Sequence, residues 1–202
     1  MIRVVLVEDE QLIRAALAGL LDLSDDIAVV GQFLSGEEAV RGTSALAPDV
    51  AVVDLQLPGM DGIDTSLALM ERVPGMKCMI LTSHARPGYL KRALSAGISG
   101  FMPKTISADD LTNAVRTVAS GGRVVDSGLA ADAIASGDSP LTTREADVLE
   151  LATDGTPVAE IARRVHLAEG TVRNYLSSAQ AKLGASNRHE AAELARRKGW
   201  IG

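Results

Sequence analysis

The first 120 residues alternate short apolar runs with longer segments in which apolar residues recur every three or four positions. The apolar runs predict five β-strands, at 2–7, 27–33, 49–54, 77–82 and 99–102. The longer segments predict helices at 10–23, 36–46, 63–73, 86–96 and 107–120, the last of them capped by Ser107 and Asp110. Strands that alternate with helices are typical of a parallel sheet covered by helices, so we expect an α/β domain over residues 1–121.

The pattern changes from residue 122 onward. Residues 122–139 are small and weakly periodic, which predicts a linker with one short helix. Thr142 and, three residues later, Glu145 form the pattern of a capping box at the start of a helix. Three further helices are expected at about 157–165, 168–183 and 188–198. We therefore expect a small all-α domain of four helices over residues 140–202.

Composition narrows the class of protein. The chain of 202 residues is 47% hydrophobic, as in an ordinary globular protein, and its single cysteine, Cys78, excludes an internal disulfide. No apolar run approaches the roughly 18 residues that a membrane span needs, and the N-terminus has no signal-peptide core. These features predict a cytoplasmic protein without membrane insertion.

The net charge of −6 conceals an asymmetry along the chain. Residues 1–138 carry 11 Lys and Arg against 18 Asp and Glu, whereas residues 139–202 carry 9 against 8. Within the second part, residues 163–198 carry 8 basic against 3 acidic side chains. The acidic and basic functions are therefore expected in different parts of the chain.

Three carboxylates are expected to meet at one edge of the sheet. Glu8 and Asp9 follow the first strand, and Asp54 ends the third. In a flavodoxin-like (βα)5 sheet of strand order 2-1-3-4-5 these two strands are neighbours, and ligands bind beyond their carboxyl ends. Mutual repulsion of the carboxylates is costly unless a cation or a proton offsets it, and Mg²⁺ suits a site of oxygen ligands.

Two further side chains should reach the same edge, because Thr82 ends the fourth strand and Lys104 follows the fifth. Together with a metal they could accept a phosphoryl group, with Asp54 as nucleophile, Lys104 neutralising the oxygens and Thr82 donating a hydrogen bond. The Pro-Gly loop at 58–62 would shape the chain beside Asp54. Each residue alone is commonly part of a solvated turn, and only their recurrence at four strand ends favours this chemistry.

The helix expected at 168–183 has two faces. Its apolar face holds Val172, Leu176, Ala179 and Leu183. The segment PVAEIARRV and a short turn precede it, which predicts a helix-turn-helix whose second helix enters the DNA major groove. From the helix alone, a solvated amphipathic helix is the alternative. The candidate DNA contacts are Thr171, Arg173, Asn174, Ser177, Lys182 and Arg188, with Arg173 and Asn174 at base edges and Lys182 and Arg188 at phosphates.

The motifs VEDE, VVDLQLPGMDG, ILTSHA and GISGFMPK resemble the receiver domain of bacterial two-component response regulators. This resemblance covers residues 1–121 and implies phosphorylation by a sensor histidine kinase. The site residues that it implies are Asp54 as phosphoacceptor, Glu8, Asp9, Asp54 and the Gln56 main-chain carbonyl as Mg²⁺ ligands, Thr82 and Phe101 as switch residues, and Lys104 as the lysine of the site.

The motifs LTTREADVLELATDG, EIARRV and GTVRNYLSSAQAKLGASNRHEAAELA resemble the LuxR-type helix-turn-helix of the NarL/FixJ family, over residues 140–202. They are most similar to the DesR group, whose regulators control membrane-lipid desaturation. The resemblance implies binding to promoter DNA at desaturation or related envelope genes. One helix-turn-helix reads only a half-site, so we expect a homodimer on phosphorylation. An activator would also contact RNA polymerase. Ala168 stands where the family usually has Ser or Thr as N-cap.

Three other functions fit parts of the sequence. A Mg²⁺-dependent phosphatase with an aspartyl-phosphate commonly has a second Asp two residues after the nucleophile, where this chain has Gln56. A sigma-like promoter-recognition factor shares LTTRE and EIA but needs a helical polymerase-binding region upstream, where this chain is α/β. A docking module independent of phosphate is disfavoured by the intact set of Asp54, Thr82 and Lys104. We therefore predict a transcription regulator rather than an enzyme.

Overall fold

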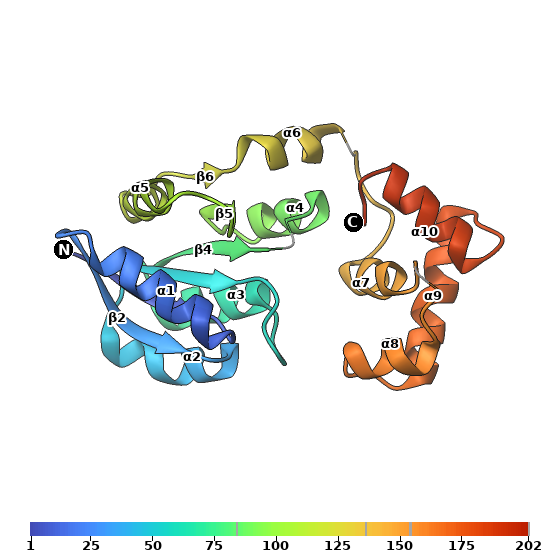
Figure 1. The fold of residues 1–202 in the computed structure, drawn as a ribbon, viewed down its shortest axis with the longest axis horizontal. Coiled ribbons are helices and arrows are strands. Elements are labelled where there is room, and N and C mark those ends of the chain that lie inside the picture. The colour runs from blue at the N-terminus through green and yellow to red at the C-terminus, as the bar shows by residue number, and fades with distance from the viewer. Residues whose placement is uncertain (84, 136, 154, 202) are drawn as a thin grey trace. The chain divides into compact units, whose positions relative to one another are not determined.

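The computed structural model describes residues 1–83, 85–135, 137–153 and 155–201, and the chain divides into two compact units (Figure 1). The first unit comprises Met1–Ala85 and Arg92–Ser127. The second comprises Arg86–Lys91 and Gly128–Gly202. The first contains the predicted α/β sheet and the second contains the predicted helical domain.

The sheet of the first unit is parallel throughout. Its strands are β1 (Ile2–Val7), β2 (Ile27–Phe33), β3 (Val50–Asp54), β4 (Lys77–Thr82), β5 (Gly100–Pro103) and β6 (Val124–Val125), in the order β2-β1-β3-β4-β5-β6. The predicted order of the first five strands is confirmed. The prediction of only five strands is wrong, because Val124 and Val125 pair with Gly100 and Phe101 and extend the sheet inside the segment expected to be a linker.

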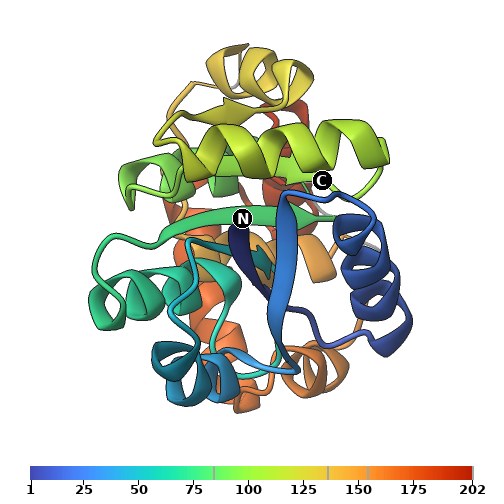
Figure 2. The same cartoon turned by 90° about the vertical axis from the view of Figure 1, so that its left-hand side faces the viewer.

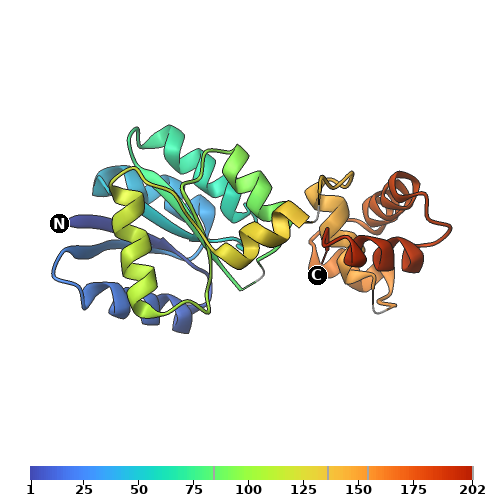
Figure 3. The ribbon, with the colours of Figure 1, turned by 90° about the horizontal axis from the view of Figure 1, so that it is seen from above.

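Helices cover both faces of this sheet. They are α1 (Gln11–Asp22), α2 (Gly36–Gly42), α3 (Gly62–Arg72), α4 (Pro87–Ser95) and α5 (Ala108–Ala119). Figures 2 and 3 show α1 and α5 on one face, with α2 and α3 on the other. The Ser107 side chain caps α5 by accepting a hydrogen bond from the Asp110 N–H, as predicted.

One helix is shorter than expected. The pattern over 36–46 predicts a single helix, but α2 ends at Gly42 and the chain continues as a 3-10 turn, η1 (Thr43–Leu46). Gly42 lies against the Phe33 ring, where an added Cβ would come within 2.6 Å of a ring carbon. The close approach of the chain to β2 therefore depends on a glycine that also weakens the helix.

The core of the first unit lies between the sheet and its helices. Central strand residues such as Val4, Leu6, Val52 and Met79 are almost completely buried. Burial on both faces explains why these strands are continuous apolar runs rather than alternating patterns. The strand ends are thereby held rigidly, which fixes the side chains that follow them.

The second unit is helical. After α6 (Ser127–Ala135) come α7 (Thr143–Leu151), α8 (Val158–Arg164), α9 (Glu169–Leu183) and α10 (Arg188–Arg197). Thr142 and Glu145 form the predicted capping box at the start of α7. Between α8 and α9 the chain turns at His166, whose φ of 53° is left-handed. The helices enclose a separate core, which includes Val148, Leu149, Ile161, Val172 and Leu176.

Within the described parts of the chain, every helix is too short or too polar to cross a bilayer.

Candidate functional site

Three carboxylates meet at the carboxyl edge of the sheet, as predicted. Parallel pairing of β1 with β3 sets Val7 beside Val53, so Glu8 and Asp54 lie close together beyond that pair. Glu8 and Asp54 are buried and Asp9 is exposed, and one oxygen from each of the three lies within 4.8 Å of the others. The carboxylates therefore form one cluster that is open to solvent through Asp9.

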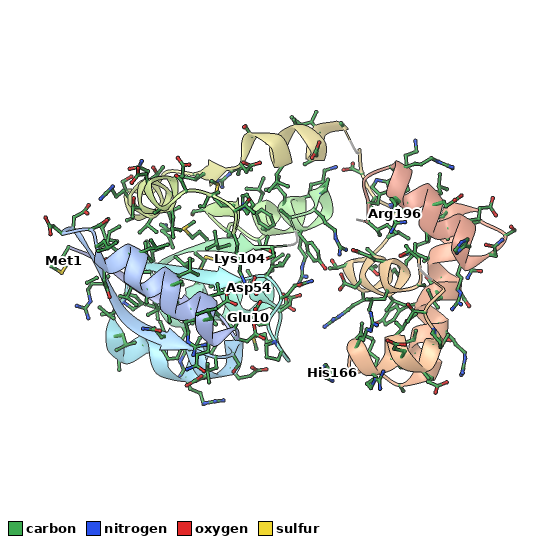
Figure 4. All side chains as sticks on the ribbon, in the orientation of Figure 1. Met1, Glu10, Asp54, Lys104, His166 and Arg196 are labelled. Atoms are coloured by element: carbon green, nitrogen blue, oxygen red, sulfur yellow. The ribbon has the colours of Figure 1, made fainter. Side chains whose placement is uncertain are left out.

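Lys104 joins this cluster. Its Nζ lies 2.7 Å from Glu8 Oε2 and 3.2 Å from Asp54 Oδ2, and its side chain is only 10% exposed. Figure 4 shows Asp54 and Lys104 near each other at the ends of their strands. The Lys104 N–H donates to the Thr82 carbonyl at 2.9 Å, which extends the pairing of β4 with β5 and positions the lysine.

Burial and charge shift the pKa of two members of the cluster. Burial raises the pKa of Glu8, assisted by the nearby Asp54 charge, and the hydrogen bond from Lys104 only partly opposes this rise. Burial tends to lower the pKa of Lys104, but its hydrogen bond to Glu8 and the charges of Asp54 and Glu8 outweigh burial and raise it. Lys104 therefore stays protonated, and the excess negative charge of the cluster is incompletely compensated.

The donor set fits a hard divalent cation. Three carboxylates against one lysine leave a formal charge of −2 when all are ionised, and each carboxylate offers one oxygen to a common point. Oxygen ligands and water are what Mg²⁺ prefers, and the exposed Asp9 leaves room for water. The cluster can therefore hold a metal ion.

The loop after Asp54 needs its glycines. A Cβ on Gly62 would lie 2.0 Å from the Asp54 carbonyl oxygen, so only glycine permits α3 to begin this close to the strand end. Gly59 has a φ of 79°, which favours glycine as well. The Gly62 N–H donates to the Leu55 carbonyl and closes the loop. Gln56, the predicted carbonyl ligand, lies in this loop and is exposed.

The predicted switch residues lie inside the sheet. Thr82 is the last residue of β4 and Phe101 pairs with Ile80 and Val125 within β5, and both side chains are completely buried. Thr82 thus reaches the edge where Asp54 and Lys104 meet. Phe101 is separated from solvent, so a change at its position requires movement of its neighbours.

Sequence reasoning missed two arginines that hold the site from outside. Arg14 of α1 donates to the Glu8 main-chain carbonyl at 2.7 Å. Arg92 of α4 pairs with Asp61, the residue that caps α3, and with Asp64. The N-cap pattern at Asp61 was a readable signal, whereas the arginine contacts depend on tertiary packing.

The predicted faces of α9 are confirmed. Val172, Leu176 and Ala179 are buried in the core of the second unit. Arg173, Asn174 and Ser177 are exposed, and Thr171 is half-buried beside them. The buried stripe fixes the rotation of α9, so the opposite polar face is available to a ligand.

The basic side chains near α9 have partners within the chain. Arg173 pairs with Glu169 at 2.6 Å, both on the exposed face. Lys182 Nζ lies 2.7 Å from the buried Glu145, and Arg188 donates to the Thr156 carbonyl at 3.3 Å. Lys182 and Arg188, predicted to contact phosphates, thus also connect α9 and α10 to the rest of their unit.

Glu145 is the centre of a polar network. Besides the capping box with Thr142, it accepts hydrogen bonds from Ser178 and Lys182 of α9. Burial alone would raise its pKa, but the hydrogen bonds from Lys182, Ser178 and Thr142 outweigh burial and lower the pKa to about 2. Glu145 is therefore a stably ionised link between α7 and α9.

Two family models match the chain, one over its α/β part and one over its helical part. Residues 4–116 match the response regulator receiver domain, and residues 139–195 match the bacterial regulatory proteins of the luxR family. The first match covers most of β1 and the whole of β2 to β5, together with the carboxylate cluster. The second spans α7 to α9 and most of α10.

Relatives match the chain along its whole length. The chain is 42% identical over 201 residues to the transcriptional regulatory protein YvfU and 41% identical to the transcriptional regulatory protein DesR, both of Bacillus subtilis (strain 168), with 100% of each chain covered. Among solved structures, the response regulator ChrA of a heme-sensing two-component system is 31% identical, with a TM-score of 0.58 over 99% of this chain and 98% of that one. The chain belongs to the NarL/FixJ response regulators, and it is a transcriptional regulator that joins a receiver domain to a LuxR-type DNA-binding domain.

Proposed function

We propose that Asp54 is the phosphoacceptor of this regulator and that phosphorylation controls promoter binding by α9. The observation that carries the proposal is the convergence of Asp54, Glu8 and Lys104 at one buried strand edge, with Lys104 within 3.2 Å of both carboxylates. Burying several charged groups together costs folding free energy, so a cluster of this kind favours a functional role.

In the proposed reaction an Asp54 oxygen attacks the phosphorus of a phosphohistidine on a sensor kinase. An acyl phosphate O–P bond forms, the P–N bond breaks, and the leaving imidazole takes up a proton. Lys104 neutralises charge on the phosphoryl oxygens, and Thr82, at the end of the neighbouring strand, donates a hydrogen bond to one of them.

Glu8, Asp9, Asp54 and the Gln56 carbonyl are the proposed ligands of Mg²⁺. Bound Mg²⁺ would supply further positive charge to the phosphoryl oxygens during transfer. The residual negative charge of the cluster supports this assignment, because the incoming phosphoryl group is itself negative and Lys104 alone does not balance both.

For promoter DNA, we propose that α9 enters the major groove, with Arg173 and Asn174 at base edges. One helix of this length reads a half-site, so a homodimer formed on phosphorylation would present two helices about one DNA turn apart. The proposed partners are a sensor histidine kinase, promoter DNA and, for an activator, RNA polymerase. We place this regulator in the cytoplasm, and resemblance to DesR favours desaturation or related envelope genes as targets.

The first test is labelling with acetyl phosphate and Mg²⁺, followed by intact-mass spectrometry. The native chain should gain one phosphoryl group, and Asp54→Asn should gain none. Asp25→Asn is the matched control, because Asp25 is an exposed carboxylate in the turn before β2, outside the cluster, and it should label like the native chain. Chelation of Mg²⁺ should suppress labelling.

The second test is DNA footprinting of the native chain before and after labelling. Protection should appear or extend only after phosphorylation, and Asp54→Asn should lack the response. Equal labelling of Asp54→Asn and the native chain would remove the phosphoacceptor assignment, and protection independent of labelling would remove the control of DNA binding by phosphate.

A further inference from the structure

The exposed face of α9 carries an acidic residue where DNA is expected. Glu169 is the first residue of α9 and its side chain is 47% exposed. The buried stripe through Val172 and Leu176 fixes the rotation of the helix, so Glu169 and Arg173, four residues apart, project from the same side. A helix that only needed affinity for a polyanion would gain nothing from this carboxylate.

Glu169 is directly bound to the base-reading arginine. Its Oε2 accepts a hydrogen bond from Arg173 Nη2 at 2.6 Å, and the Arg173 side chain is 62% exposed. One corner of the guanidinium is therefore occupied, and its other N–H groups are left for a ligand. A planar fork restrained in this way can present two parallel donors to a guanine edge in a fixed direction.

The other candidate cations of this surface are held differently. Lys182 is bound to the buried Glu145, and Arg188 is half-buried and donates to a main-chain carbonyl. Among these three, Arg173 alone has an exposed carboxylate as its partner. Its pairing therefore does not serve the core of the unit, and both members of the pair remain accessible to a ligand.

We infer that Glu169 is a specificity-determining residue for DNA, acting with Arg173 as one reading unit. Arg173 donates to a guanine, and the second oxygen of Glu169 accepts from the amino group of an adjacent cytosine. At other base steps the carboxylate meets acceptors and phosphates, and like-charge repulsion disfavours binding. This inference rests on the proposed entry of α9 into the major groove.

The chain offers a matched control for the loss of one charge. On α8, Glu160 pairs with Arg164 in the same i, i+4 arrangement, and both Glu160 and Glu169 lie in the first turn of their helices. Glu160→Gln and Glu169→Gln change net charge by the same amount and remove equivalent surface ion pairs. Only Glu169, however, belongs to the helix proposed to read bases.

The experiment selects duplexes with 20 randomised base pairs on the full phosphorylated chain, and then titrates the selected and scrambled duplexes. For the native chain we expect a motif that contains a guanine next to a cytosine. Glu169→Gln should bind scrambled DNA a few-fold more tightly, lose the cytosine preference, and reduce discrimination by about tenfold. Glu160→Gln should keep the native motif and discrimination, whatever its small effect on affinity.

The outcomes separate this inference from the proposed function. If the native chain selects no motif at all, promoter recognition by α9 fails and the inference fails with it. If the native chain selects a motif that Glu169→Gln and Glu160→Gln retain equally, only the role of Glu169 is overturned. Thermal unfolding of both variants checks that the exposed substitutions leave the fold intact. A third variant, Glu169→Asp, has a shorter side chain that should lose the Arg173 contact. It should therefore select the same motif as Glu169→Gln.

Discussion

Each unit of the protein contains a lysine paired with a buried glutamate, and the two pairs have opposite electrostatic balances. Lys104 pairs with both Glu8 and Asp54, whereas among the described residues Lys182 pairs with Glu145 alone. Glu145 also accepts from Ser178 and Thr142, which lowers its pKa to about 2, while burial raises the pKa of Glu8. A buried carboxylate whose charge is fully balanced by donors, such as Glu145, is typical of a structural contact. A buried carboxylate whose charge is only partly balanced, such as Glu8, is typical of a site that binds a cation or a reactant.

The largest expected effect is on phosphorylation, when Lys104 is removed from its cluster with Glu8 and Asp54. Lys104→Met should reduce the rate of labelling by acetyl phosphate by roughly 10²–10³, because it removes a positive charge aimed at the phosphoryl oxygens. Labelling rates measured by mass spectrometry at saturating Mg²⁺ would check this. Lys182→Met removes a paired lysine from the other unit and should leave the rate unchanged, and an equal loss in both variants would contradict the contrast.

The next effect concerns acid stability of the DNA-binding unit. The pKa of Glu145 is lowered from 4.5 to about 2, so its ionised form is favoured by folding. The stability that it contributes is present above about pH 4.5 and is lost as the pH falls toward 2. The shift corresponds to at most about 3 kcal/mol. Trp200, the single tryptophan, packs against the core of this unit and can report its unfolding.

Urea titrations followed by Trp200 fluorescence at pH 6, 4 and 3 would measure this loss. Glu145→Gln should be less stable than the native chain at pH 6, and the difference should shrink as the pH falls. Glu193→Gln is the control, since Glu193 is an exposed carboxylate on α10. A difference between Glu145→Gln and the native chain that stays constant with pH would show that the Glu145 charge is not the source of the stabilisation.

A smaller loss is expected from the lysine side of the same link. Lys182→Ala should destabilise the unit by about 1–2 kcal/mol, less than a fully buried pair would, because the lysine side chain is 36% exposed. The same fluorescence titration measures it, with Lys198→Ala on the exposed end of α10 as control. A Lys182→Ala variant as stable as Lys198→Ala would make the contact to Glu145 incidental.

The sequence predicts the secondary structure and the strand-end cluster well, but it does not predict every contact between side chains far apart in the chain. The convergence of Glu8, Asp54 and Lys104 follows from strand order, because residues at the carboxyl ends of neighbouring parallel strands must meet. Strand β6 escapes prediction, because two valines among small residues carry too little periodicity and are ordered only by pairing with β5. An edge of this kind is decided by tertiary contacts.

The Glu145 network shows the same limit within the helical unit. Its capping box with Thr142 is local and is readable three residues away, whereas Ser178 and Lys182 lie 33 and 37 residues further along the chain. Because these partners are distant in sequence, only the position of Lys182 on its helix was available, and that position predicts a phosphate contact. The side chain positions reveal a second role that no pattern within α9 contains.

The smallest expected effect is on the salt dependence of DNA binding, and it asks whether the paired Lys182 still contributes to phosphate contacts. A free lysine that neutralises one phosphate changes the slope of log affinity against log salt by about one unit. Because Glu145 already pairs with the Lys182 ammonium, Lys182→Ala should change the slope by clearly less than one unit.

Titrations of the phosphorylated chain at three salt concentrations, on selected and scrambled duplexes, would measure the slope. Arg173→Ala provides the comparison, since it should cost roughly 1–3 kcal/mol on the selected duplex and reduce discrimination. A full unit of slope lost in Lys182→Ala would mean that DNA draws the lysine away from Glu145, and that the link between α7 and α9 opens on binding.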